Sequence, residues 1–146
     1  MKSVVVTSEQ ELDTCLGIRR EVFIIEQEVP EDLEIDELDH LESAATHVLL
    51  YDNEQAVATA RLKPYNDDTA KVQRVAVLRQ CRGNGYGDAM MQVLEQLARS
   101  QNYREIVLDA QCHAAGFYEK LGYEIISDKF MDAGIEHVRM KKALRQ

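Results

Sequence analysis

The chain has 146 residues, 45% of them hydrophobic, which is the size and apolar content of one globular domain with a core. The formal net charge of −9 argues against a broad nucleic-acid-binding surface, and no apolar run approaches the length of a membrane span. The three cysteines have no paired spacing and the N-terminus has no signal-peptide pattern, so we expect a cytoplasmic protein with residues 1–146 in one domain.

The N-terminal half predicts a strand, a long helix and a hairpin. Residues 3–7 are rich in β-branched side chains and typical of a strand, and Ser8 marks the start of a helix that we expect to end near Glu26. Residues 28–43 combine a proline with dense acid, so we expect mostly loop with one turn of helix. Two strand-like runs within residues 46–65 predict a β-hairpin.

The C-terminal half alternates between strands and helices. Helices are expected directly after the glycine-rich stretch 82–87 and over residues 113–121, where apolar side chains recur at helical spacing. Strands are expected at residues 69–78, 104–110, 123–128 and 136–144. The order β-α-β-β-β-α-β-α-β-β predicts a mixed sheet with helices on its faces.

Charge is distributed unevenly along the chain. No Lys or Arg occurs between Glu21 and Ala60, where acidic residues cluster, whereas the rest of the chain is close to balanced. The acidic segment is either a solvated loop or a surface that attracts a cationic acceptor.

The stretch "RGNGYG" (Arg82–Gly87) precedes a helix. A helix start exposes unpaired N–H groups and positive dipole character, and bare glycine backbone lets a phosphate approach them. A tight strand-to-helix turn is the plainer explanation, but one glycine would normally suffice for it. A P-loop would need a lysine that is missing, and the dinucleotide fingerprint fails because its third glycine falls on Asp88.

Two segments carry a resemblance to a known family. Arg82, Gly85 and Gly87 form the pattern R-x-x-G-x-G, and "AAGFYEKLGYEII" (residues 114–126) follows at a suitable distance. Together they resemble the two signatures of the GCN5-related N-acetyltransferase (GNAT) superfamily. The resemblance implies an α/β, single-domain acyl-CoA N-acyltransferase fold, with a mixed, mostly antiparallel sheet and helices on both faces.

The first helix narrows the resemblance. Its pattern R-x-x-V-F-x-x-E-Q is similar to that of a subgroup of small bacterial acetyltransferases, and the matching residues are Arg19, Val22, Phe23, Glu26 and Gln27. The acyl-homoserine-lactone synthases, which share the fold, begin somewhat similarly and are an alternative.

The family resemblance implies acetyl-CoA as cosubstrate. The pantetheine arm would pair with the backbone at Val75, Ala76 and Val77. The diphosphate would lie on the segment formed by Arg82, Gly83, Asn84, Gly85, Tyr86, Gly87 and Asp88. No metal is expected, because the four histidines have no ligand spacing.

The resemblance also implies catalytic roles. Tyr118 would protonate the departing thiolate, although its place on an apolar stripe also suits a core tyrosine. Gln73 stands where the family often has a glutamate base, and an amide cannot accept a proton usefully at neutral pH. A base would then come from another residue or through water, and the candidates are Glu26, His113, Glu21 and His47.

Substrate contacts are expected from Arg19, Phe23, Arg61 and Arg74. Because an unpaired buried guanidinium is costly, the arginines are equally well explained as structural ion pairs. The predicted function is transfer of acetyl from acetyl-CoA to a primary amine by direct attack, with a small cationic amine preferred as acceptor. An amino-sugar phosphate, a protein amine and a non-catalytic CoA-binding module are alternatives, and the resemblance allows a homodimer.

Overall fold

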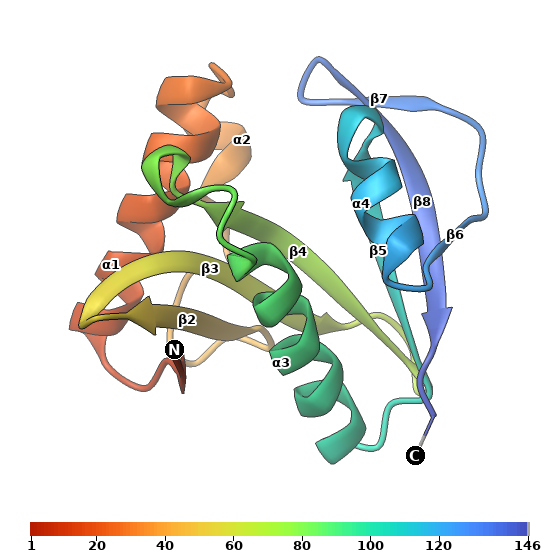
Figure 1. The fold of residues 1–146 in the computed structure, drawn as a ribbon, viewed down its shortest axis with the longest axis horizontal. Coiled ribbons are helices and arrows are strands. Elements are labelled where there is room, and N and C mark those ends of the chain that lie inside the picture. Colours follow the sequence, from red (N-terminus) through yellow and green to blue (C-terminus); the bar gives the residue numbers. More distant parts are fainter. Residues whose placement is uncertain (146) are drawn as a thin grey trace.

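The computed structural model describes residues 1–145 and contains one mixed sheet with helices packed against it (Figure 1). The strands follow the spatial order β1-β2-β3-β4-β5-β8-β6, and β7 pairs with β8. In chain order the elements are β1 (Lys2–Val5), α1 (Glu9–Arg19), η1 (Arg20–Glu26), α2 (Glu31–Glu34), β2 (Thr46–Asp52), β3 (Gln55–Pro64), β4 (Thr69–Val77), η2 (Arg79–Cys81), α3 (Tyr86–Ser100), β5 (Glu105–Gln111), η3 (Cys112–Ala114), α4 (Ala115–Lys120), β6 (Glu124–Ile125), β7 (Phe130–Asp132) and β8 (Ile135–Ala143). The predicted α/β fold class is confirmed.

The first helix begins and ends where the sequence predicts. Ser8 and Glu11 form a reciprocal capping box, in which each side chain accepts a hydrogen bond from the other residue's backbone N–H. After Arg19 the helix continues as the π-helical η1 up to Glu26. Wider turns of this kind are often found at functional sites, and η1 lies beside the cavity described below.

The central strands β4 and β5 are parallel and pair over only part of their length. The pairing runs from Thr69 opposite Glu105 to Val72 opposite Leu108, and beyond this point the two strands diverge (Figure 1). From Gln73 onward, therefore, one edge of β4 has no neighbouring strand. A β-bulge marks the same place, because β4 carries one residue more than β3 there and Arg74 has a φ of 59°.

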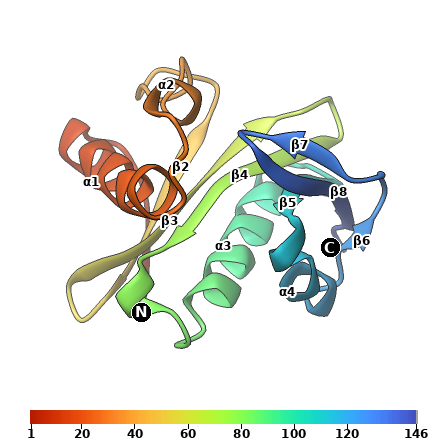
Figure 2. The same cartoon turned by 90° about the horizontal axis from the view of Figure 1, so that it is seen from above.

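Helices cover both faces of the sheet. Helices α1 and α2 lie on one face, and α3 and α4 lie on the other (Figure 2). Side chains of β5 alternate between these faces: Ala110 belongs to the core, whereas Gln111 reaches η1 on the α1 side. Residues directly opposite in an antiparallel pair share a face, so His137 of β8, opposite Gln111, also faces the α1 side.

The C-terminal strands differ in detail from the sequence prediction. Only Glu124–Ile125 of the expected strand 123–128 pairs, and a further strand, β7, forms a hairpin with β8 through Ala133 and Gly134. The sequence around β7 has no clean alternation of apolar and polar residues, which is why the pattern gave no signal. Within residues 1–145 no helix is both long and apolar enough to cross a membrane.

Candidate active site

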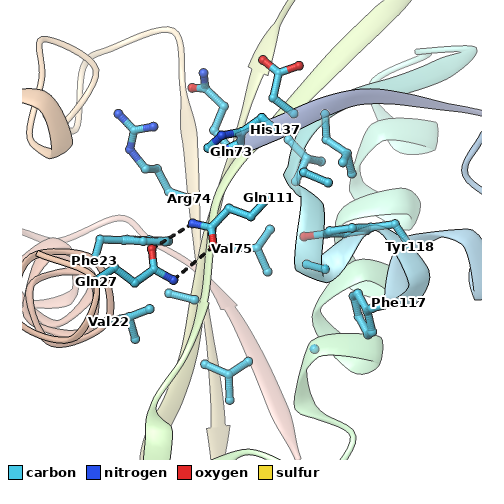
Figure 3. A pocket seen from close by; sticks show the side chains of 18 of the residues that line it. Val22, Phe23, Gln27, Gln73, Arg74, Val75, Gln111, Phe117, Tyr118 and His137 are labelled. Carbon is cyan, nitrogen blue, oxygen red and sulfur yellow. Dashed lines mark hydrogen bonds between the residues drawn. The ribbon is translucent and has the colours of Figure 1, made fainter. Parts of the chain in front are cut away.

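A cavity of about 730 Å³ opens where β4 and β5 diverge (Figure 3). Its lining comes from both faces of the sheet. The glycine loop, defined as residues 82–88, and the helix α4 contribute from the α3 side. The helix η1, the segment around α2 and the β7–β8 hairpin contribute from the α1 side. The cavity therefore connects the two faces through the gap in the sheet.

The glycine loop presents a row of free backbone donors. Gly83 and Gly85 have φ angles of 84° and 81°, a conformation that other residues adopt only at a cost. Within residues 1–145, the N–H groups of residues 83–88 donate to no backbone or side-chain acceptor, and they end at the positive start of α3. This arrangement fits the diphosphate of a coenzyme A molecule. Of the residues predicted to hold it, all but Asn84 line the cavity.

The free edge of β4 faces the same cavity. Val75, Ala76 and Val77 line it, as the sequence predicted for the residues that hold the pantetheine arm. A strand edge without a partner offers N–H and C=O groups to an extended chain. The edge and the glycine loop are tied together, because Nε of Arg82 donates to the carbonyl oxygen of Val77 at 3.1 Å.

Tyr118 reaches the cavity from α4, and its hydroxyl points toward Val75 and Gln111 (Figure 3). The ring is buried between Phe117 and Tyr123, with edge-on contacts at 5.0 and 5.9 Å. The hydroxyl makes no hydrogen bond with residues 1–145, and burial raises the pKa of Tyr118 to about 12. The side chain is thus both a core residue and a protonated donor at the cavity, so the two interpretations are compatible.

Gln27 and Gln111 form a pair that spans the cavity. Each amide donates to the carbonyl oxygen of the other, at 3.3 and 2.8 Å, and the pair joins η1 to the end of β5 (Figure 3). Gln27 belongs to the R-x-x-V-F-x-x-E-Q pattern, but no sequence pattern indicates that it contacts Gln111. The contact depends on strands brought together by the fold.

Two predicted substrate-binding arginines lie outside the cavity lining. Arg19 and Arg61 are each 1% exposed. Arg19 binds Glu34 and Asp39 through contacts of 2.6 to 3.1 Å, and Arg61 binds Asp36 and Asp39 through contacts of 2.7 to 3.1 Å. The structure corrects the expectation of substrate contacts from these two residues, because their guanidinium groups are occupied by carboxylates.

The carboxylates come from the acidic segment, which folds over the sheet and is not simply a solvated loop. We call this group the buried arginine cluster, and its members are Arg19, Arg61, Arg74, Glu34, Asp36 and Asp39. Burial opposes the charge of Asp36, but hydrogen bonds from Arg61 outweigh it and lower its pKa to about 2. At Glu34 burial dominates, and the pKa is raised despite the neighbouring arginines.

The other two predicted substrate contacts, Phe23 and Arg74, do line the cavity. Arg74 holds Glu34 at 3.2 Å while its side chain stays 22% exposed. Its left-handed backbone at the bulge is unusual for a residue with a long side chain. Strain of this kind clusters at ligand sites, and here it turns the arginine toward α2 at the edge of the cavity (Figure 3).

Two of the four base candidates named from the sequence, Glu26 and His113, are placed differently. Glu26 does not line the cavity. Its carboxylate accepts two hydrogen bonds from Arg82, at 2.6 and 2.8 Å. These hydrogen bonds lower the pKa of Glu26 and make it a weaker base. His113 lines the cavity from the turn before α4. Gln73 also lines it, and its side-chain oxygen accepts from Nε of Arg61 at 3.0 Å.

A cavity through a split sheet, a free strand edge and a glycine loop at a helix start define a protein of the acyl-CoA N-acyltransferase class. The family model described as "Acetyltransferase (GNAT) domain" matches residues 6–144, and the chain belongs to this family. It is therefore an N-acetyltransferase.

Related sequences and a related crystal structure are consistent with membership of this family. The chain is 39% identical to the uncharacterized N-acetyltransferase YjcF of Bacillus subtilis over 143 residues, covering 97% of this chain and 99% of the relative. It is 30% identical to the protein ElaA of Escherichia coli over 143 residues, covering 95% and 92%. The crystal structure of Escherichia coli ElaA has a TM-score of 0.84 at 26% identity, covering 97% and 99%.

A more distant structure extends the likeness in fold. An aminoglycoside 6′-N-acetyltransferase complexed with coenzyme A has a TM-score of 0.80 at 17% identity, with 100% of this chain and 98% of that chain covered.

Proposed function

We propose that residues 1–146 form one N-acetyltransferase domain that moves acetyl from acetyl-CoA to a primary amine by direct attack. The observation that carries this proposal is the run of six backbone amides at residues 83–88, which have no acceptor within residues 1–145 and lie at the mouth of a cavity that passes through the sheet. Such donors at a helix start suit a diphosphate, and the family provides the corresponding chemistry.

The chain's own residues have distinct parts in this proposal. Backbone amides of residues 83–88, with Asp88 in the first turn of α3, hold the diphosphate end of the cosubstrate. The free edge of β4 at Val75–Val77 holds the pantetheine arm in an extended form and supplies an N–H to the thioester carbonyl oxygen. The bound cosubstrate supplies the activated acetyl group.

Tyr118 supplies the proton that the departing sulfur needs. A thiol has an ordinary pKa of roughly 8.5, so a thiolate leaves more easily if a neighbouring acid protonates it. The pKa of Tyr118, raised to about 12 by burial, keeps the phenol protonated at neutral pH. Its hydroxyl is directed into the cavity toward Val75, beside the expected path of the thioester.

The acceptor enters from the α1 face, where η1, α2 and the β7–β8 hairpin surround the cavity. The preference for a small cationic amine loses part of its basis, because Glu34, Asp36 and Asp39 are already paired with arginines. An amino-sugar phosphate loses support as well, since two of the three arginines that could form its basic site, Arg19 and Arg61, are buried, and only Arg74 lines the cavity. We propose a primary amine without a phosphate group.

Release of free thiol tests the function. Purified protein is mixed with acetyl-CoA and a panel of amines that includes alkyl diamines, amino acids and glucosamine 6-phosphate. We expect amine-dependent thiol release well above the rate without protein. Binding of CoA without turnover across the panel would instead support the non-catalytic CoA-binding module.

A further inference from the structure

We propose that His137 is the general base of this site, and this inference rests on the acetyl transfer proposed above. The sequence gives no reason to single out this histidine, which lies within an ordinary strand. In the structure it lines the cavity, is 8% exposed, and lies at the same end as Gln73 (Figure 3). It thus occupies the region where the family's usual glutamate is missing.

The hydrogen bonding of the imidazole defines which nitrogen is available. Nδ1 lies 2.7 Å from the backbone carbonyl oxygen of Ile135. A carbonyl oxygen only accepts, so Nδ1 carries the hydrogen and Nε2 of the neutral ring has the free lone pair. Nε2 makes no hydrogen bond within residues 1–145. Every fully buried side-chain nitrogen in this range does have a hydrogen-bond partner, so Nε2 is not fully buried. It is therefore accessible, in a residue that lines the cavity.

The orientation of the ring is fixed by its neighbours. The imidazole stacks on Phe130 with ring centres 5.9 Å apart and an interplanar angle of 25°. Phe130 is directly opposite His137 in the β7–β8 pairing. The hairpin that the sequence did not predict thus holds the base in place, in the way that a second group commonly orients a catalytic histidine.

His137 and Tyr118 approach the cavity from opposite faces of the sheet. His137 is opposite Gln111 in the β5–β8 pairing and shares the α1 face with it, whereas Tyr118 belongs to α4 on the other face. This separation is compatible with direct attack, in which the amine loses its proton on the side from which it enters and the sulfur gains one where it leaves.

Among the carboxylates that line this end of the cavity, Asp132 of β7 is exposed to solvent, whereas Asp109 and Glu34 are already paired with basic side chains. Burial opposes the charge of Asp109, but hydrogen bonds from Arg139 and Lys71 outweigh it and lower its pKa. Glu34 is held by Arg19 and Arg74.

Candidates farther away are unsuitable for geometric reasons. Glu26 is bound by Arg82 outside the cavity lining. His47 is buried, and its Nε2 is 2.9 Å from the carbonyl oxygen of Leu38. His113 lines the cavity and remains the alternative, so its variant is compared below with that of His137.

The proton balance is as follows. Nε2 of His137 accepts a proton from the acceptor ammonium, directly or through one water. The freed nitrogen forms a bond to the thioester carbon, and the carbon–sulfur bond breaks as the nitrogen loses its second proton to solvent. Tyr118 protonates the sulfur and then takes up a proton from solvent. His137 releases the proton that it accepted to solvent. One proton is released for each amide and thiol formed.

The test compares two small acceptors in His137→Asn and His113→Asn. Ethylamine is almost fully protonated at neutral pH and needs a base, whereas hydroxylamine is largely unprotonated and does not. We expect His137→Asn to lower kcat with ethylamine by about 100-fold, and with hydroxylamine by less than about 5-fold. His113→Asn tests the alternative base, and we expect no selective loss with ethylamine in that variant. An equal loss with both acceptors, or a selective loss in His113→Asn, would overturn the assignment.

A measurement on the unmodified protein keeps the proposal testable if the variant does not fold or neither amine is used. A proton–nitrogen correlation spectrum of the imidazole groups distinguishes the two neutral tautomers. We expect His137 to carry its hydrogen on Nδ1. The opposite tautomer, with the hydrogen on Nε2, would leave no lone pair toward the cavity and would refute the role of base. The tautomer is determined without CoA, so a failure of the base assignment is distinguishable from a failure of the glycine loop to bind CoA.

Discussion

Replacing Arg19 by methionine tests whether this arginine is structural, as its burial indicates, or binds substrate. Arg19 is 1% exposed and makes four hydrogen bonds to Glu34 and Asp39, at 2.6 to 3.1 Å. Both carboxylates are themselves almost fully buried. Methionine fills a similar volume but leaves two buried charges with one arginine partner fewer.

Removing one partner from a buried ion pair typically costs about 3 to 5 kcal/mol, because the remaining charge is left uncompensated. For a chain of this length that corresponds to a fall in Tm of about 10 to 15 °C. The neighbouring Arg20 is the matched control, since it pairs with Glu31 at 3.2 Å while the two side chains are 51% and 63% exposed. We expect Arg20→Met to cost less than about 1 kcal/mol.

Urea unfolding of the two variants measures the difference, and acceptor KM is determined at a temperature where both are folded. We expect the large stability loss only in Arg19→Met, with its acceptor KM within about twofold of the unmodified protein. A loss below about 1 kcal/mol, together with a rise in KM of tenfold or more, would refute the structural role and restore the substrate contact.

Three further changes follow from the site and the buried arginine cluster. Tyr118→Phe should lower kcat by about 100-fold, and an unchanged kcat would contradict the role of Tyr118 as the acid. Because its pKa is about 12, deprotonation of Tyr118 should not lower the rate until the pH approaches that value. Gly85→Ala should weaken CoA binding at least about 10-fold by calorimetry, because alanine adopts a positive φ only at a cost. Gly134→Ala, at a similar φ of 77°, should leave the affinity for CoA unchanged. Equal affinities in the two variants would exclude the glycine loop as the CoA-binding segment. Asp36 has a folded-state pKa of about 2, below its unfolded value near 4, so its contribution to stability is present above pH about 4 and is lost as the pH falls to about 2. In Asp36→Asn the unfolding free energy should therefore fall by about 2 kcal/mol less over this pH range. An unaltered loss of stability at acid pH would contradict this.

Local patterns were sufficient for most of the elements. Ser8 and Glu11 form the predicted helix start, and the glycine-rich stretch lies at the beginning of α3 as expected. Both signals act over a few residues, through backbone groups that neighbouring side chains either satisfy or leave free. The strand at residues 136–144 was predicted, but its hairpin partner β7 was missed, because β7 has only three residues, too few to show a periodic pattern.

The site is formed by contacts between residues that are far apart in sequence, and local sequence patterns did not predict these contacts. A structural ion pair was one interpretation of Arg19, but its partners Glu34 and Asp39 are brought to it only by the fold. His137 received no signal at all, because its position beside Gln111 follows from strand pairing rather than from its neighbours in sequence. Residue type alone could not distinguish a buried arginine with carboxylate partners from one that faces a ligand.

The crystal structure of the protein with CoA bound tests the central claim most directly. We predict the diphosphate on the backbone amides of residues 83–88, the pantetheine arm along Val75–Val77, and the sulfur beside the hydroxyl of Tyr118. A diphosphate bound away from these amides, or a sulfur out of reach of Tyr118 on the other side of the sheet, would contradict the account.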